Sequence, residues 1–103
     1  MDRIEKLKEF LKQSPQDNFL QHALALEHIK AGDEDKARSL FEEILGRDPG
    51  YIGSYYHLAK LLERIGQPDE ALRWYEKGMA AAEKAGDRHA LGELKSAYEE
   101  LLY

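Results

Sequence analysis

The chain has 103 residues, of which 43% are hydrophobic and 34% charged, as in one ordinary domain rather than a membrane protein or a disordered chain. It has no cysteine, which excludes disulfides, thiolate metal sites and cysteine nucleophiles. The net charge of −5 comes from interleaved acidic and basic residues, and the lack of a basic stripe argues against nucleic-acid binding.

No stretch of the sequence is apolar for long enough to serve as a secretory leader or to cross a bilayer. The N-terminal segment carries a charge at every second or third position, and the longest purely apolar run is 79–82. We therefore expect a soluble, cytoplasmic protein without membrane association. It is either a full protein or a fragment of a longer one.

A first amphipathic helix is predicted over residues 2–13. Ile4, Leu7, Phe10 and Leu11 recur at helical spacing, so they share one side of this helix.

Residues 18–51 are predicted to form a pair of helices around a tight turn. Gly32 separates the two helices because glycine tolerates the left-handed conformation that ends a helix, and Pro49 ends the pair. Apolar residues at helical spacing mark the face that each helix buries. They are Phe19, Leu20, Ala23, Leu24 and Leu26 in the first helix and Ala37, Leu40, Phe41, Ile44 and Leu45 in the second.

A shift of 34 residues repeats this plan over residues 52–85. The shift brings small, aromatic and turn residues into register together, which predicts a true internal repeat. It aligns Pro15 with Pro49, Leu24 with Leu58, Ala25 with Ala59, Gly32 with Gly66, Ala37 with Ala71, Phe41 with Tyr75 and Glu42 with Glu76.

The second pair is expected to bury the corresponding faces. Trp74 lies at the edge of the apolar stripe, and we interpret it as a packing residue rather than part of an aromatic binding patch. The predicted core residues are Tyr55, Leu58, Ala59, Leu61, Leu62, Ala71, Leu72, Trp74, Tyr75 and Met79.

A last helix is predicted over residues 87–102, after a stop at Gly86. Its apolar stripe resembles that of the first helix in a pair, with a slip of two residues, and the helix can close the stack. At the other end, residues 2–13 shift onto the second helix of a pair, as a half repeat would. The prediction is six helices in all. The stripe of the last helix is Leu91, Leu94, Tyr98 and Leu101.

These residues and their spacing resemble the tetratricopeptide repeat (TPR) pattern, in which W-x2-L-G-x2-Y is followed by A-x3-F and P over 34 residues. The first unit fills it with Gln21, Leu24, Ala25, His28, Ala37, Phe41 and Pro49. The second unit fills it with Tyr55, Leu58, Ala59, Leu62, Ala71, Tyr75 and Glu83.

The resemblance implies an all-α fold, a TPR-like α-solenoid of antiparallel helix pairs with about six helices in a right-handed stack. It implies a single domain over 1–103. The parts of that domain are an N-terminal helix that resembles a half repeat (2–13), repeat 1 (18–51), repeat 2 (52–85) and a C-terminal capping helix (87–102).

Three positions depart from the family pattern. Gln21 and His28 replace two aromatic residues, so the first helix of repeat 1 is a weak match. His28 is interpreted as a core or half-buried histidine because it occupies an aromatic position. Glu83 replaces the terminal proline of repeat 2, which lets the second helix of that repeat run on to Gly86.

No group of residues in the sequence indicates catalysis or metal binding. His22 and His28 fall on different faces of one helix, and the other two histidines lack a nearby ligand at zinc-like spacing. The carboxylates alternate with lysines and arginines on expected solvent faces instead of converging on a cleft. We therefore predict no enzymatic activity, no cofactor and no metal.

The resemblance also implies a binding surface, because ligands of this family usually lie along the concave face formed by the first helices of successive repeats. Lys60 and Arg64 are one turn apart and could hold an acidic side chain or a C-terminal carboxylate. The lysine–asparagine clamp for chaperone tails is not reproduced, because His22 and Leu26 occupy its positions. The groove candidates are Phe19, His22, Leu26, Lys30, Gly53, Tyr56, Lys60, Arg64, His89, Gly92 and Ser96.

Two functions fit the sequence. The first is a non-catalytic interaction module, a monomer or weak homo-oligomer, that binds a peptide or protein segment of unknown identity in the concave groove. The alternative is a structural or self-associating repeat protein, or a fragment of a longer scaffold, that assembles through its end helices. The end residues concerned are Phe10, Leu11, Leu101, Leu102 and Tyr103.

Overall fold

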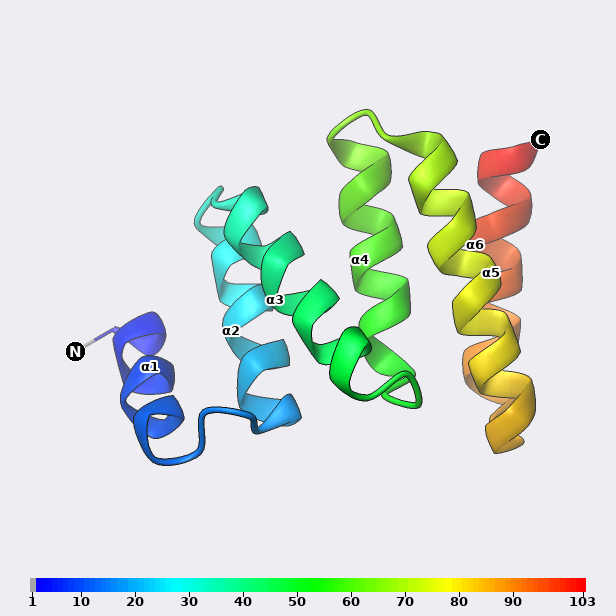
Figure 1. Ribbon diagram of the computed structural model, residues 1–103. Coiled ribbons are helices and arrows are strands. Elements are labelled where there is room, and N and C mark those ends of the chain that lie inside the picture. Colours follow the sequence, from blue (N-terminus) through cyan, green and yellow to red (C-terminus); the bar gives the residue numbers. More distant parts are fainter. Residues whose placement is uncertain (1) are drawn as a thin grey trace. The chain divides into compact units, whose positions relative to one another are not determined.

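The computed structural model describes residues 2–103, and every regular element in this range is a helix (Figure 1). The prediction of an all-α chain with six helices is confirmed for these residues. The helices are α1 (Arg3–Gln13), α2 (Asn18–Lys30), α3 (Glu34–Arg47), α4 (Gly53–Arg64), α5 (Pro68–Ala85) and α6 (Arg88–Leu102).

The helices fall into two compact units. The first unit ends at Arg47 and holds α1 to α3, and the second unit, Asp48–Tyr103, holds α4 to α6. In the first unit α2 packs against both α1 and α3. In the second unit α5 packs against both α4 and α6, and α4 also contacts α6. The single domain over 1–103 and the repeat boundaries stay predictions.

Aspartates cap the start of three helices. The carboxylates of Asp2, Asp17 and Asp87 each accept a hydrogen bond from the backbone N–H three residues later, at 2.8, 3.0 and 3.0 Å. Each bond satisfies a donor in the first turn that has no partner within its helix. Helix α5 instead begins with Pro68, which loses nothing by lacking an N–H at that position.

Three glycines end helices in the left-handed conformation. Gly32, Gly66 and Gly86 have φ of 83°, 80° and 72°. After each of them, the next residue donates its N–H to a carbonyl of the last helical turn, at 2.8, 2.8 and 2.9 Å. Helix α5 runs to Ala85 before this stop, as the replacement of the terminal proline by Glu83 predicts.

A network of hydrogen bonds between polar side chains links parts of the first unit beside its apolar core. Gln21 is only 4% exposed, and its Nε2 donates to the carbonyl of Pro15 at 3.0 Å. Its amide oxygen accepts from Arg47 at 2.7 Å, and Arg47 also donates to Asn18 at 2.5 Å. Gln21 can therefore replace the aromatic residue of the repeat pattern, because both ends of its buried amide are hydrogen-bonded.

The second unit makes the same link with a different side chain. Tyr55 occupies the position that corresponds to Gln21, and its hydroxyl donates to the carbonyl of Pro49 at 2.5 Å. The 34-residue shift carries Gln21 onto Tyr55 and Pro15 onto Pro49. In both units a side chain in the first turn of a helix thus fixes the loop that leads into it.

Gly78 lies where the three helices of the second unit meet. A Cβ added there would be 2.7 Å from the Cβ of Tyr55 on α4 and 3.1 Å from Cδ1 of Leu94 on α6. The first of these distances is shorter than any real contact between carbon atoms, so only glycine allows α4 and α6 to approach α5 this closely.

Three of the larger apolar residues of α5 lie at the edge of the core, whereas Tyr75 is fully buried. The sequence predicts Leu72, Trp74 and Met79 as core residues, whereas the structure leaves each of them half-buried. Close approach of the neighbouring helices requires a small residue at Gly78. Trp74 packs against the Tyr55 ring, with centroids 6.1 Å apart. The buried positions of α5 are Ala71, Tyr75, Gly78 and Ala82.

A pair of glycine substitutions tests this packing. Gly78→Ala should lower the free energy of unfolding by about 1–3 kcal/mol, because the new methyl group has no space. Gly92→Ala on α6 is the matched control, since a Cβ there meets nothing within 4 Å. It should stabilise the protein by about 0.5–1 kcal/mol through helix propensity alone. Urea denaturation followed by circular dichroism measures both, and equal effects of the two changes would contradict the close approach at Gly78.

Candidate functional site

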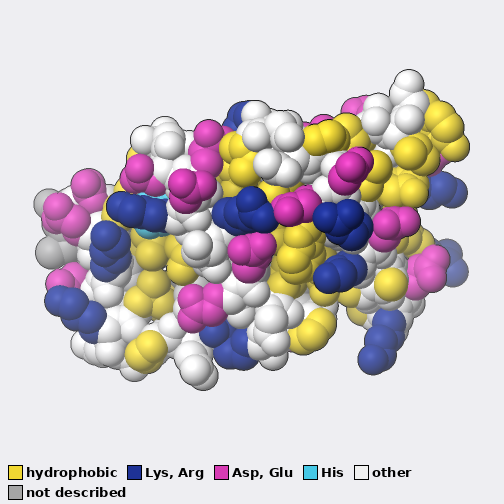
Figure 2. All heavy atoms as spheres, turned by 45° about the horizontal axis from the view of Figure 1, so that its top comes forward, with side chains coloured by type: hydrophobic (Ala, Val, Ile, Leu, Met, Phe, Trp, Pro, Cys, Tyr) yellow, Lys and Arg dark blue, Asp and Glu magenta, His cyan; other side chains and the backbone are white. Residues whose placement is uncertain are grey.

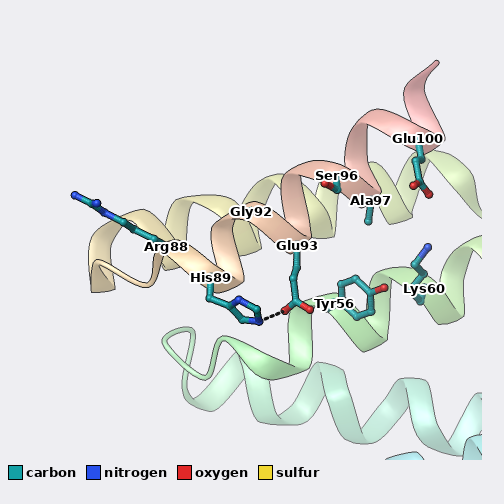
Figure 3. A pocket seen from close by; sticks show the side chains of 9 residues that line it. All are labelled: Tyr56, Lys60, Arg88, His89, Gly92, Glu93, Ser96, Ala97 and Glu100. Carbon is teal, nitrogen blue, oxygen red and sulfur yellow. Dashed lines mark ion pairs between the residues drawn. The ribbon is translucent and has the colours of Figure 1, made fainter.

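A hollow of about 520 Å³ lies between α4 and α6 in the second unit. Figure 3 shows side chains from both helices directed towards it. Gly92 contributes open space, because apart from its chain neighbours and the backbone of its own helix no atom lies within 4 Å of where its Cβ would be. The lining residues that matter below are Tyr56 and Lys60 on α4 and His89, Gly92, Glu93, Ser96 and Glu100 on α6.

A second hollow of about 420 Å³ continues from the first towards the beginnings of α4 and α6. The two hollows share Tyr56, His89 and Glu93, so they form one trough, which we call the α4–α6 groove. The second hollow adds His57 from α4 and Asp87 from the start of α6.

The buried faces of α4 and α6 determine which side chains reach the groove. Tyr55 and Ala59 are buried, so Tyr56 and Lys60, each one position further along α4, lie on the flank of that helix. Leu94 is 1% exposed and packs near Gly78, which leaves the preceding Glu93 on the groove side of α6. The groove is therefore a consequence of how the core orients these two helices.

The positive charge on the α4 wall has a partner on its own helix. The Nζ of Lys60 lies 3.7 Å from a carboxylate oxygen of Glu63 and 5.8 Å from the centre of the Tyr56 ring. Glu63 also accepts a hydrogen bond from the Tyr75 hydroxyl. The pKa of Tyr75 is raised, first by burial, then by this bond and by the charge of Glu63, with a smaller contribution from Glu100.

The α6 wall carries two carboxylates. Glu93 lies 3.6 Å from Nε2 of His89, a pair that is ionic only when the histidine is protonated (Figure 3). Glu93 also acts on His57, whose pKa is lowered by burial while the Glu93 charge opposes that shift. Glu100 lies across the groove from Lys60, and within residues 2–103 it makes no ion pair (Figure 3).

The groove brings together six of the candidates predicted from sequence, namely Gly53, Tyr56, Lys60, His89, Gly92 and Ser96. Arg64 is exposed on α4 and is not among the residues that line either hollow. Sequence reasoning missed Glu93 and Glu100. They stand one helical turn from His89 and Ser96, so helical spacing alone could have identified them.

The remaining candidates lie on α2 in the first unit. Phe19 is 71% exposed, and Leu26 is half-buried. Lys30 forms an ion pair with Glu27 at 3.2 Å. The His22 ring packs edge-on against the buried Phe41, with centroids 5.4 Å apart, so it is partly a core residue. The role of these four residues in binding stays a prediction.

The charges on the molecular surface are mixed. On the face drawn in Figure 2, lysine and arginine side chains are interspersed with aspartate and glutamate, as the interleaved sequence predicts. Among residues 2–103, no group of three or more histidine, aspartate or glutamate side chains is placed to hold a metal ion. Over the same described range, no helix is long and apolar enough to span a membrane.

Comparison with known proteins finds the same repeat. The profile of the tetratricopeptide repeat family matches residues 28–97, a range that takes in all of α4 and most of α6. A TPR repeat-containing protein from Pseudomonas aeruginosa is 28% identical over 91 residues, which cover 88% of this chain and 87% of the relative.

Solved structures show the likeness in three dimensions. The chain is similar to a tetratricopeptide repeat domain protein from Salinibacter ruber, with a TM-score of 0.82, 41% sequence identity and coverage of 84% of this chain and 88% of that one. A protein from Bordetella parapertussis gives a TM-score of 0.85 at 26% identity and covers 99% of this chain and 89% of its own.

His28 in the first unit is a core histidine, as its place in the repeat predicts. It is 4% exposed, and its Nδ1 is buried without a hydrogen bond, 3.8 Å from a carboxylate oxygen of Asp33. Burial lowers the pKa of His28, and the charges of Lys36 on α3 and Lys8 on α1 lower it further, while Asp33 opposes them. His28 is therefore neutral in the folded chain at neutral pH.

The buried histidine should make stability depend on pH. The pKa of His28 is lower in the folded chain than in the unfolded one, so the unfolded chain binds more protons below about pH 6.5. The free energy of unfolding should be greatest above that pH and fall as the pH drops through it, by at most about 1.4 kcal/mol per pH unit.

The variant His28→Tyr restores the aromatic residue of the repeat pattern and should remove this contribution. His57, which is lowered in the same direction, contributes equally to both proteins and cancels in the difference. Urea unfolding between about pH 7.5 and 5.5 measures the two curves. Parallel curves for wild type and variant would show that His28 carries no proton-linked stability.

Proposed function

Because the chain belongs to the tetratricopeptide repeat family, we propose that it is a non-catalytic module that binds a peptide or protein segment in the α4–α6 groove. The repeat fold suits protein–protein interaction or a scaffold role, since stacked helix pairs offer long surfaces to a partner. In this proposal the protein acts as a monomer in the cytoplasm, a reducing compartment that suits a chain without cysteine.

One observation carries the proposal: side chains from two helices line a single trough and are not needed for the core. Tyr56 and Lys60 come from α4, and His89 and Ser96 come from α6. The open space at Gly92 adds room for a ligand to approach the backbone of α6. A polar trough with one aromatic side chain suits a peptide better than a small apolar ligand.

The four candidates on α2 extend the proposal to the first unit. The family places ligands along the first helix of each repeat, and α2 is the first helix of repeat 1. The exposed Phe19 ring is the strongest of these candidates because an exposed aromatic side chain can serve as an anchor for a partner. We assign it an accessory role, since the hollow at residues 14–17 and the hollow beside His28 are lined by other residues.

A bulky side chain at Gly92 tests the groove directly. Gly92→Trp should fill the groove without entering the core, because the position faces open space. A partner captured from the native host by the wild-type protein should bind this variant at least about tenfold more weakly, as expected when a central contact is blocked. Isothermal titration calorimetry with the purified partner measures the change.

Gly46→Trp is the matched control for this test. Gly46 is an exposed glycine of α3 that also faces open space, and it lies outside the groove. It should leave the affinity unchanged. Unaltered binding by the Gly92 variant, with its fold intact by circular dichroism, would rule out the groove as the binding surface.

Exposed apolar residues at the two ends favour an alternative, self-association. Phe10 on α1 is 60% exposed, and Leu102 and Tyr103 at the end of α6 are 46% and 94% exposed. Apolar side chains left uncovered in this way can pair between copies. Leu11 and Leu101 are half-buried and would contribute less.

Sedimentation equilibrium separates the two functions. The leading proposal predicts a monomer over a wide range of protein concentration. If the wild-type chain instead dimerises, and Phe10→Ser or Leu102→Ser abolishes the dimer, the end helices are the working surface and self-association replaces groove binding. A substitution at the exposed Lys95 of α6 provides a control that should have no effect on mass.

A further inference from the structure

The two walls of the α4–α6 groove differ in how far their charged side chains are already paired. On the α4 wall, Lys60 forms an ion pair with Glu63, one helical turn away, at 3.7 Å. On the α6 wall, Glu93 pairs with His89 on its own helix and acts on His57, and Glu100 makes no ion pair within residues 2–103. Arg88, the other cation at the groove, extends away from the remaining labelled side chains (Figure 3).

The two carboxylates are regularly spaced. Glu93 and Glu100 are seven residues apart in one helix, so they lie on the same face, about 10.5 Å apart along the axis. Ser96 stands between them on that face, and Gly92 lies beside Glu93. The wall between the two charges is thus made of small residues, which leaves both carboxylates accessible to a ligand in the groove.

The negative field of these groups acts on neighbouring side chains at both ends of the groove. Glu100, together with Glu63, disfavours ionisation of Tyr75 and so raises its pKa. Glu93 favours the charged form of His57, in opposition to the effect of burial. A cation placed near either carboxylate would be attracted to it, whereas an acidic ligand would be repelled.

We infer that the α4–α6 groove selects a basic protein segment with two lysine or arginine side chains about 10 Å apart, one for Glu93 and one for Glu100. This spacing corresponds to positions i and i+7 of a helix. The inference rests on the proposed function and specifies its ligand. It differs from the sequence-based expectation, in which Lys60 and Arg64 hold an acidic group.

Three synthetic peptides of about 16 residues, long enough to be partly helical, test the charge and the spacing. The first carries lysines at i and i+7, the second glutamates at the same two positions, and the third lysines at i and i+5, on opposite faces of the helix. Each is titrated into the full chain labelled with ¹⁵N, and the amide shifts of Gly92, Ser96 and Glu100 are followed. The first peptide should bind, the second should not, and the third should bind more weakly.

Matched double variants distinguish the effect of the two groove carboxylates from the effect of the protein's net charge. Glu93→Gln with Glu100→Gln should weaken binding of the first peptide roughly five- to tenfold, as expected for two solvent-exposed ion pairs. Glu83→Gln with Glu99→Gln removes the same charge from exposed positions outside the groove and should change binding less than about twofold. Added salt should weaken the wild-type complex and affect the Glu93/Glu100 variant less.

Three other outcomes would contradict either the basic ligand alone or groove binding as well. If the glutamate peptide binds in the groove and Lys60→Gln weakens it, the basic ligand is wrong while groove binding survives. If no peptide shifts the groove amides but Gly92→Trp still abolishes capture of the native partner, the charge assignment again fails alone. If no peptide binds and the Gly92 variant keeps its partner, both the inference and the proposed function fail.

Discussion

The arrangement of the second unit depends on the close approach of three helices at Gly78. Because this position has no side chain, Tyr55 of α4 and Leu94 of α6 both reach the backbone of α5. The next residue after Tyr55 is Tyr56, and the residue before Leu94 is Glu93. The contact that builds the core thereby fixes the rotation of α4 and α6, and with it two of the three side chains that both hollows of the groove share.

The helices and their pairing follow from the 34-residue period, because small and aromatic residues repeat at positions where only helix pairs can bury them. Packing at the centre of α5 does not follow in the same way. By propensity alone, Gly78 is a weak point within a helix, and Trp74 is a stronger core candidate. The structure reverses this order, since the space between α4 and α6 admits no Cβ and leaves Trp74 half-buried at the edge.

Long polar side chains explain why repeat 1 departs from the family pattern and still folds. The sequence identifies Gln21 as a mismatch but cannot show that Arg47, on another helix, reaches its amide oxygen at 2.7 Å. The bond from Gln21 to the Pro15 carbonyl has its counterpart in the bond from Tyr55 to the Pro49 carbonyl. What the repeat conserves between its two units is therefore a hydrogen bond to the preceding loop, and two different side chains supply it.

The groove was predictable in its location but not in its charge. The family resemblance implies groove positions for Tyr56, Lys60, His89 and Ser96, and the structure brings the four together. Whether a charge is available to a ligand depends instead on its partners. Lys60 has Glu63 beside it on its own helix, whereas Glu100 has no such counterpart in the described chain. Tyr56, Lys60, His89 and Ser96 are not buried, so their replacement should cost the core little. The framework and the recognition surface of this repeat can therefore vary independently.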